Sequence, residues 1–339
     1  MSQNLTVGKK GLYLSLAFSL GSAAVILYIT FEEQTLQSVM RLNPSYLGLA
    51  ALIVVALWLV EGLRIMSITK ALGYQGAIRL FSAMRVYLVT YFFAGITPLA
   101  IGEWPAQIYS LCASGLSAGE SAAVSLVRMF LTKLLFVVMA AFLLFIDGRA
   151  ARGSGLVFAL FRYAFWIMTL STAVYLFLLW QSGLAHKLLE KLLRYARFRT
   201  LYEKRPRIRR FISGLLAEAV QFQETVHQIN RKNILHFLAP LVYTVFFWSL
   251  FYSIAPVLLL GLGVMPDIRA VVTWQIMILL IIPYVPVPGG SGVAEFGLAT
   301  LFAPFVPSHI LGVFIVAWRF FTYYLTLLIG GIVTFGVKR

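Results

Sequence analysis

The chain has 339 residues, of which 60% are hydrophobic and only 12% carry a charge. This ratio excludes a soluble globular domain and indicates a protein of the membrane. The formal net charge of +16 must then be explained by where the basic residues lie.

Seven apolar runs indicate membrane helices, since a span needs about 18 or more residues with few charges. They cover residues 11–30, 46–69, 82–97, 121–146, 156–181, 234–260 and 308–337, and an eighth run covers 269–285. We interpret 11–30 as an uncleaved first span, because it lacks a small-x-small cleavage site and leads into Glu32 and Glu33. The predicted fold class is an all-α polytopic integral membrane protein, located in the cytoplasmic (inner) membrane.

The segment 184–233 holds twelve Lys and Arg against four acids, a net charge of +8. The positive-inside rule therefore places it in the cytoplasm. Leucine and phenylalanine recur on one helical face of "LAHKLLEKLLRY" and of "RRFISGLLAEAVQF". Two interpretations stay open: amphipathic helices lying on the anionic lipids of the inner leaflet, or a cytoplasmic helical hairpin that packs on itself. This pattern does not favour a nucleic-acid partner.

Uncommon residues recur 190 positions apart, which indicates an internal repeat. Trp58 matches Trp248, Gly73 matches Gly263, Pro98 matches Pro288 and Gly102 matches Gly292. With one or two residues inserted, Glu103 then matches Glu295 and Arg128 matches Arg319. The predicted organisation is an N-terminal span with an outer loop (1–44), repeat unit one (45–147), a linking span with the basic insert (148–233) and repeat unit two (234–339).

The distribution of charge predicts that the two units are inverted. Lys9 and Lys10 place the N-terminus inside, and the basic segment 184–233 must also lie inside. Unit one then begins outside and unit two begins inside. Residues 82–117 and 269–304 each read as a helical hairpin with a Pro/Gly tip, one entering from the cytoplasm and the other from outside. Full crossing and a re-entrant path both give an even number of passes, so both stay open.

Inverted repeats with Gly/Pro breaks at matching places indicate a transport site near the middle of the bilayer. Helices that begin inside the membrane present free backbone N–H groups, which attract anions. Charged side chains in apolar segments are costly, so they should face inward and form pairs. The candidate site consists of Glu103, Arg128, Lys133, Pro288, Gly289, Gly290, Gly292, Glu295 and Arg319. A purely structural pinning of the hairpin tips by the Glu–Arg pairs is the alternative.

Glu61 and Arg64 stand three residues apart near the end of the run 46–69. We interpret them as a local pair or as snorkelling groups rather than as part of a site. Gly115 and Gly119 form a G-x-x-x-G spacing, which is common in membrane helices and allows a homodimer.

Signatures of catalysis are missing from the sequence. The "GGSG" at 289–292 is no nucleophile elbow, because Val293 follows Gly292, and no P-loop motif occurs. The single cysteine, Cys112, excludes an internal disulfide and a cysteine-based metal site. We therefore expect no enzyme activity and no cofactor.

The stretch "PVPGGSGVAEFGL" before an Arg-bearing span, with the earlier "TPLAIGEWPAQIYSL" and "SLVRMF", resembles the lysylphosphatidylglycerol synthase transmembrane-region family. That family includes the flippase half of the multiple peptide resistance factor and many stand-alone relatives. The resemblance covers roughly residues 10–337 and implies movement of lipids with modified head groups between leaflets. The soluble aminoacyl-transferase half has no counterpart here, so lipid synthesis is not implied.

The sequence thus predicts a translocator of an anionic or head-group-modified phospholipid. Arg128, Arg319 and the amides at Gly289–Gly292 are expected to hold the phosphate, with Lys133 in the same cavity. Glu103 and Glu295 are expected to neutralise the arginines in the empty site, or to contact a cationic head group. Three alternatives stay open: a carrier of polyprenyl-phosphate-linked sugars, a membrane enzyme acting on lipid head groups, and a non-transporting scaffold or regulator recruited through the basic insert.

Overall fold

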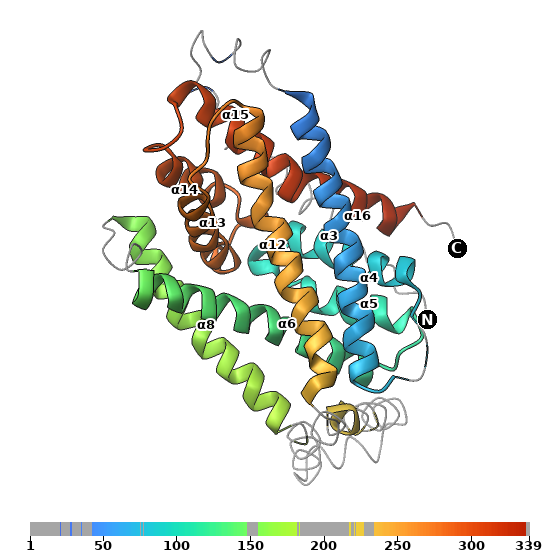
Figure 1. The fold of residues 1–339 in the computed structure, drawn as a ribbon. Coiled ribbons are helices and arrows are strands. Elements are labelled where there is room, and N and C mark those ends of the chain that lie inside the picture. The colour runs from blue at the N-terminus through green and yellow to red at the C-terminus, as the bar shows by residue number, and fades with distance from the viewer. Residues whose placement is uncertain are drawn as a thin grey trace.

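The fold is all-helical throughout the part of the chain that the structure describes. The computed structural model describes residues 43–147 (without 75 and 77), 155–181, 222–226 and 234–336, together with the single positions 21, 28, 35, 183, 217 and 220. Five helices in it are long and apolar enough to cross a membrane. They correspond to the predicted runs 46–69, 121–146, 156–181, 234–260 and 308–337 and establish an all-α polytopic membrane protein (Figure 1).

Unit one and the linking span contain four α-helices of more than fifteen residues. Their elements are α3 (Pro44–Ala71), α4 (Leu80–Ile96), the 3₁₀ turn η1 (Pro98–Ala100), α5 (Glu103–Cys112), α6 (Ala118–Ala141) with its π-helical end η2 (Phe142–Asp147), and α8 (Leu156–Trp180). The predicted first span 11–30 and most of the basic insert 184–233 lie outside the described residues.

Unit two repeats this order of elements. They are the 3₁₀ turn η3 (Ile234–Phe237), α12 (Leu238–Gly261), α13 (Ile268–Ile281), the turns η4 (Ile282–Tyr284) and η5 (Pro288–Gly290), α14 (Val293–Phe302), α15 (Ser308–Arg319), the π-helix η6 (Phe320–Tyr324) and α16 (Leu325–Phe335). The runs 82–97 and 269–285 form α4 and α13, the two shorter apolar helices, each the first arm of a predicted hairpin.

The backbone follows the 190-residue repeat. The turns η1 and η5 begin at Pro98 and Pro288, and helices α5 and α14 begin at Glu103 and Val293. Left-handed backbone recurs with the same offset: φ is +88° at Gly73 and +77° at Gly263. The predicted repeat is therefore a repeat of structure as well as of sequence.

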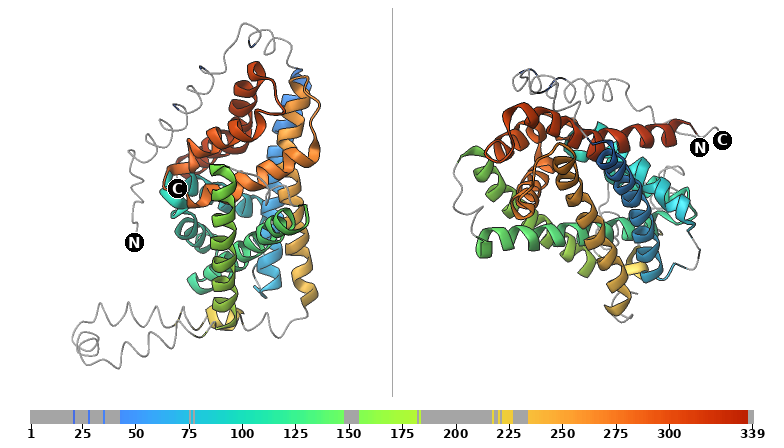
Figure 2. Two further views of the ribbon diagram at one scale, coloured as in Figure 1. Left: turned by 90° about the vertical axis from the view of Figure 1, so that its left-hand side faces the viewer. Right: turned by 45° about the horizontal axis from the view of Figure 1, so that its top comes forward.

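Helices α3 and α12 pack side by side and antiparallel at the centre of the molecule (Figure 1). The start of α3 meets the end of α12, where the Asn43 amide donates to the Gly261 carbonyl over 3.1 Å, and α3 also contacts η3 at the start of α12. Antiparallel packing of matching helices is the arrangement that an inverted repeat requires. Helix α4 packs beside α3, whereas α13 and α15 pack beside α12 (Figure 2).

The two hairpins open at opposite ends of the α3–α12 pair, and their tips meet. At the base of hairpin one, the Tyr74 hydroxyl donates to the Gly115 carbonyl (3.2 Å), while the base of hairpin two adjoins Gly261 and so lies beside Asn43. The tips η1 and η5 contact each other. Beside this contact the Tyr323 hydroxyl of η6 donates to the Gly95 carbonyl near the end of α4 (3.0 Å), which joins the two units near the break in hairpin one.

Candidate functional site

Glu61 and Arg64 belong to a buried ionic network on α3. The predicted local pair is present, with 3.2 Å between Arg64 Nη1 and Glu61 Oε2. The interpretation as snorkelling groups is wrong, because Glu61 is 0% and Arg64 1% exposed and a snorkelling side chain keeps its charged end in water. A glutamate so deeply buried requires several partners.

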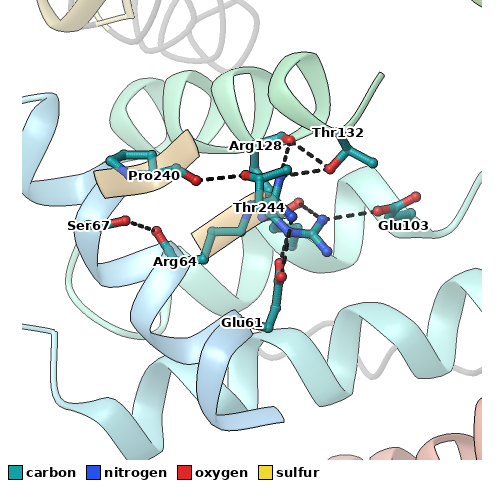
Figure 3. A network of polar contacts seen from close by, with 9 residues as sticks. Glu61, Arg64, Ser67, Glu103, Arg128, Thr132, Pro240 and Thr244 are labelled. Atoms are coloured by element: carbon teal, nitrogen blue, oxygen red, sulfur yellow. Dashed lines mark hydrogen bonds and ion pairs between the residues drawn. The ribbon is translucent and has the colours of Figure 1, made fainter. Parts of the chain in front are cut away.

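Arg128 of α6 supplies the further partner and joins three helices (Figure 3). Its Nε forms an ion pair with Glu61 Oε1, and its Nη1 lies 3.0 Å from Glu103 Oε1 and 3.2 Å from Gln107 Oε1 on α5. Arg64 also fastens α3 to α6, because its Nη2 donates to the Arg128 carbonyl and to Thr132 Oγ1, each over 2.7 Å. The predicted Glu103–Arg128 pair is thus present as part of a four-charge network.

The network forms one wall of a cavity of about 310 Å³ between the two units. Four charged side chains line it: Arg64, Glu103, Arg128 and Lys133. The remaining walls come from both units, including Thr90 and Tyr91 of α4, Trp248 and Phe251 of α12, and Ile282 and Pro283 of hairpin two. The cavity therefore has a charged side made by unit one and a mainly apolar side made by unit two.

Lys133 enters this cavity without a carboxylate within ion-pair distance among the described residues. Its ammonium lies 3.3 Å from Ser171 Oγ and 3.6 Å from Met168 Sδ on α8, and 5.4 Å from the centre of the Tyr175 ring. These neutral partners support the side chain weakly. The cavity thus contains a cation that forms no ion pair with the described residues.

The predicted pair of unit two, Glu295 and Arg319, is present but enclosed. Arg319 Nε lies 2.9 Å from Glu295 Oε1, and the two side chains are 3% and 0% exposed. Arg319 Nη2 also donates to the Gly289 carbonyl over 3.2 Å and to Ser291 Oγ over 3.4 Å, and the guanidinium lies 4.3 Å from the centre of the Tyr323 ring. The cluster ties the tip of hairpin two to α15 and does not line the cavity.

The helix start in hairpin two is occupied by its own side chain. Glu295 Oε2 accepts the Gly292 amide over 2.7 Å, so that amide is not available to an anion in this structure. The predicted site residues therefore fall into two groups. Glu103, Arg128 and Lys133 gather at the cavity, whereas Pro288, Gly289, Gly290, Gly292, Glu295 and Arg319 form the enclosed tip.

The two glutamates are not strictly equivalent in the repeat. Glu103 is the first residue of α5, whereas Glu295 is the third residue of α14. The position in α14 lets Glu295 fold back on its own helix start, as in a capping box, whereas Glu103 reaches Arg128 on α6.

Sequence reasoning missed Glu61, Arg64 and Gln107 as members of the site. The signal for the first two was their place in the run 46–69, because an ionisable residue inside a span is by default a functional candidate. No comparable signal marked Gln107. Among the described residues, no three His, Cys, Asp or Glu side chains gather into a metal-binding group.

A second, wholly different hollow lies on the neighbouring face of α6. It measures about 850 Å³ and is lined by apolar and aromatic side chains of α6, α8, η3, the start of α12 and Val226. Phe130, Leu131 and Leu134 alternate along α6 with Met129, Thr132 and Lys133 of the charged cavity. Helix α6 thus lies between the cavity with the charged wall and the apolar hollow.

Comparison with known proteins assigns the family. One relative, described as "UPF0104 membrane protein" from Archaeoglobus fulgidus, is 28% identical over 322 residues, which is 94% of each chain. No solved structure matches the chain. Residues 12–330 match the family described as "Lysylphosphatidylglycerol synthase TM region". The chain therefore belongs to the lysylphosphatidylglycerol synthase transmembrane-region family.

Proposed function

We propose that the protein is a translocator that carries a lipid head group across the cytoplasmic membrane while the tails stay in the bilayer. The observation that carries the proposal is the charged cavity between the inverted units, with Arg64, Glu103, Arg128 and Lys133 in its wall. Each ion at the centre of a bilayer costs about 2.5–3.5 kcal/mol even by insertion measurements. A cavity that keeps a lysine without an ion pair among the described residues is hard to explain as packing alone.

The lengths of the hairpin helices bear on the depth of the tips in the membrane. Helices α5 and α14 have ten residues each, so each spans about 15 Å of a hydrocarbon core about 30 Å thick. We therefore infer that both hairpins are re-entrant and meet near the middle of the membrane. Rocking of one unit against the other would then open the cavity to each side in turn, as in other inverted-repeat transporters.

Glu103 is the carboxylate that the lipid phosphate displaces. Its side chain is 28% exposed and its ion-pair partner is Arg128, whereas Glu61 is fully buried between two arginines. An incoming phosphate can replace Glu103 on Arg128, because the Glu103 side chain is partly exposed and a guanidinium binds phosphate in the same bidentate geometry as carboxylate. Glu61 keeps the arginine in place during the exchange.

The surroundings of the cavity favour a lipid over a free anion. The apolar hollow across α6 has room for hydrocarbon, and clefts of this lining bind apolar chains. Passive or ion-coupled movement is proposed, since the sequence lacks a P-loop, and no chemical conversion of the lipid is proposed.

The test is transport by purified protein in liposomes that carry a fluorescent phospholipid. Protection of the fluorophore from an impermeant quencher reports the leaflet. The purified protein should accelerate the exchange. Glu103→Gln should slow it at least tenfold, because the carboxylate that exchanges with the lipid phosphate is gone. Phosphate binding should not weaken, because that carboxylate competes with the phosphate for Arg128.

Glu120→Gln is the matched control for this test. Glu120 accepts the Ser117 amide in a capping box at the start of α6 and does not line the cavity, so the same substitution there should leave transport unchanged. Exchange at the rate of empty liposomes with every lipid tested, or an unaltered rate in Glu103→Gln, would rule out the proposed mechanism.

A further inference from the structure

We infer that the cavity selects a head group whose charge is an uncompensated phosphate anion, and that Lys133 is the residue that selects it. This inference rests on the proposed translocation and names its substrate class. It is carried by the charges of the cavity and by the hydrogen-bond donors around it.

The charges give the sign of the ligand. The network and the cavity together hold three cations, Arg64, Arg128 and Lys133, against two carboxylates, Glu61 and Glu103. Both carboxylates are engaged by arginine, and the positive charge that remains is that of Lys133. A phosphate anion completes this balance, whereas a head group with a net positive charge increases the excess.

Buried donors without a partner give the chemistry of the ligand. Four buried polar atoms in or beside the cavity lack a hydrogen-bond partner: Arg64 Nε, Thr90 Oγ1, Gln107 Nε2 and Trp248 Nε1. Three of them can only donate, and the Thr90 hydroxyl can donate as well. An unpaired buried donor is costly, so the three that belong to lining residues, Arg64, Thr90 and Trp248, point to an acceptor-rich group that binds in the cavity.

A phosphate with hydroxyl or ester oxygens satisfies both requirements. It brings a negative charge to Lys133 and acceptor oxygens to the unpaired donors. The lining holds one carboxylate, Glu103, which a bound phosphate frees from Arg128. The two ammonium groups of a lysyl ester outnumber it and add to the positive charge of Lys133. The geometry thus disfavours an aminoacylated, net cationic lipid, although such a lipid is what the family description suggests.

Binding is measured by thermal unfolding of the purified full-length protein with short-chain lipids. The probes are dioctanoyl phosphatidylglycerol, its lysyl ester, and glycerol 3-phosphate as the head group without tails. A ligand raises the unfolding midpoint in proportion to its affinity for the folded state. Dioctanoyl phosphatidylglycerol, called the glycerol lipid below, should stabilise the protein at concentrations at least tenfold lower than its lysyl ester does.

The role of Lys133 is tested by Lys133→Met, which keeps the length of the side chain and removes its charge. Affinity for the glycerol lipid should fall about tenfold or more, since a charged hydrogen bond contributes about 1.5–3 kcal/mol, and Lys133→Arg should restore most of it. Lys70→Met is the matched control, because Lys70 is exposed at the end of α3 and should bind the lipid as the parent does.

Thr90→Val separates a binding role from a structural one. Its hydroxyl has no hydrogen-bond partner in this structure, so the variant should unfold at the parental temperature or above, yet bind dioctanoyl phosphatidylglycerol about three- to tenfold more weakly. A structural hydroxyl would give the opposite pattern, with lower stability and unchanged affinity, and would count against the inference.

The outcomes distinguish this inference from the proposed function. Transport and tight binding of the lysyl ester, with none of the glycerol lipid, would overturn the anion selection and leave translocation standing. Selective binding of the glycerol lipid without transport of any lipid would support the anion site and refute translocation. Equal stabilisation by glycerol 3-phosphate would support the phosphate as ligand and contradict a requirement for lipid tails.

Discussion

Three glutamates in apolar helices, Glu61, Glu103 and Glu295, occupy three different environments. Glu61 is buried between Arg64 and Arg128, Glu295 is buried between Arg319 and its own helix start, and Glu103 is partly exposed at the cavity. Removing one partner of a buried ion pair leaves the other uncompensated and typically costs about 3–5 kcal/mol. An exposed partner costs much less, because water replaces it.

Substitution of each glutamate by glutamine should therefore give different losses of stability. We expect Glu61→Gln and Glu295→Gln to lower the free energy of unfolding by about 3 kcal/mol or more, and Glu103→Gln by about 1 kcal/mol or less. Thermal unfolding of the three purified proteins in one detergent measures the order. An equal loss of stability in Glu103→Gln and Glu295→Gln would indicate that both Glu–Arg pairs serve only to hold helices together.

Transport by Glu295→Gln protein that remains folded tests the second pair directly. Because the pair is buried and does not line the charged cavity, we expect the rate per folded molecule to stay within about threefold of the parent. Complete loss of transport with parental stability would instead give Glu295 and Arg319 the working role that the sequence predicts for them.

At the scale of the elements, the hairpin tips show how the two units form one turn from different residues. Tip two places Gly289 and Gly290 in left-handed backbone, with φ of +62° and +63°, whereas tip one places Leu99 and Ala100 there, with φ of +54° and +53°. Left-handed backbone costs a non-glycine residue about 1–2 kcal/mol. The tip of unit one therefore stores strain that the tip of unit two avoids.

Opposite substitutions at the two tips should have opposite effects. Leu99→Gly should stabilise the protein by up to about 1 kcal/mol, because it relieves strain at a half-exposed position. Gly289→Ala should destabilise it by about 2 kcal/mol or more, since its Cβ would overlap the Tyr323 ring in addition to the backbone strain. Gly48→Ala in α3, where a Cβ meets no atom within 4 Å, is the control and should be neutral or slightly stabilising. Unfolding midpoints in which Gly289→Ala matches Gly48→Ala would contradict this account of the tip.

The elements were largely predictable, whereas the site was predictable only in part. The offset between Pro98 and Pro288 gave both tips, because prolines and glycines mark breaks that no other residues replace. The same offset could not show which partners Glu103 and Glu295 reach. Glu103 is the first residue of α5 and Glu295 the third of α14, and a shift of two residues moves a side chain by about 200° around a helix. Nor could the offset place Glu61, because its partner Arg128 lies 67 residues away and only the packing of α3 against α6 brings them together.

At the scale of the whole molecule, the two units share a backbone plan and divide their tasks. The positions 190 residues after Glu61 and Arg64 are Phe251 and Ile254, so unit two lacks this half of the charged network. Its remaining pair, Glu295 and Arg319, does not line the cavity, and unit two contributes an apolar wall. This divergence leaves the inversion readable in the backbone, in the antiparallel α3 and α12. We propose that symmetry provides the two-sided motion and that asymmetry provides a single head-group site.

The inversion predicts that the bases of the two hairpins face opposite sides of the membrane. Ala113, at the base of hairpin one, and Met265, at the base of hairpin two, are both exposed and accept a cysteine in a Cys112→Ser background. With the basic segment in the cytoplasm, an impermeant maleimide added to intact cells should label Met265→Cys. It should label Ala113→Cys only after the membrane is permeabilised, and the Cys112→Ser protein itself should stay unlabelled in both conditions. Labelling of both cysteines from the same side would refute the inverted arrangement and, with it, alternating access between the tips. Labelling of Ala113→Cys alone in intact cells would agree with inverted units but show that the protein lies the other way round in the membrane. Only this orientation depends on the positive-inside rule.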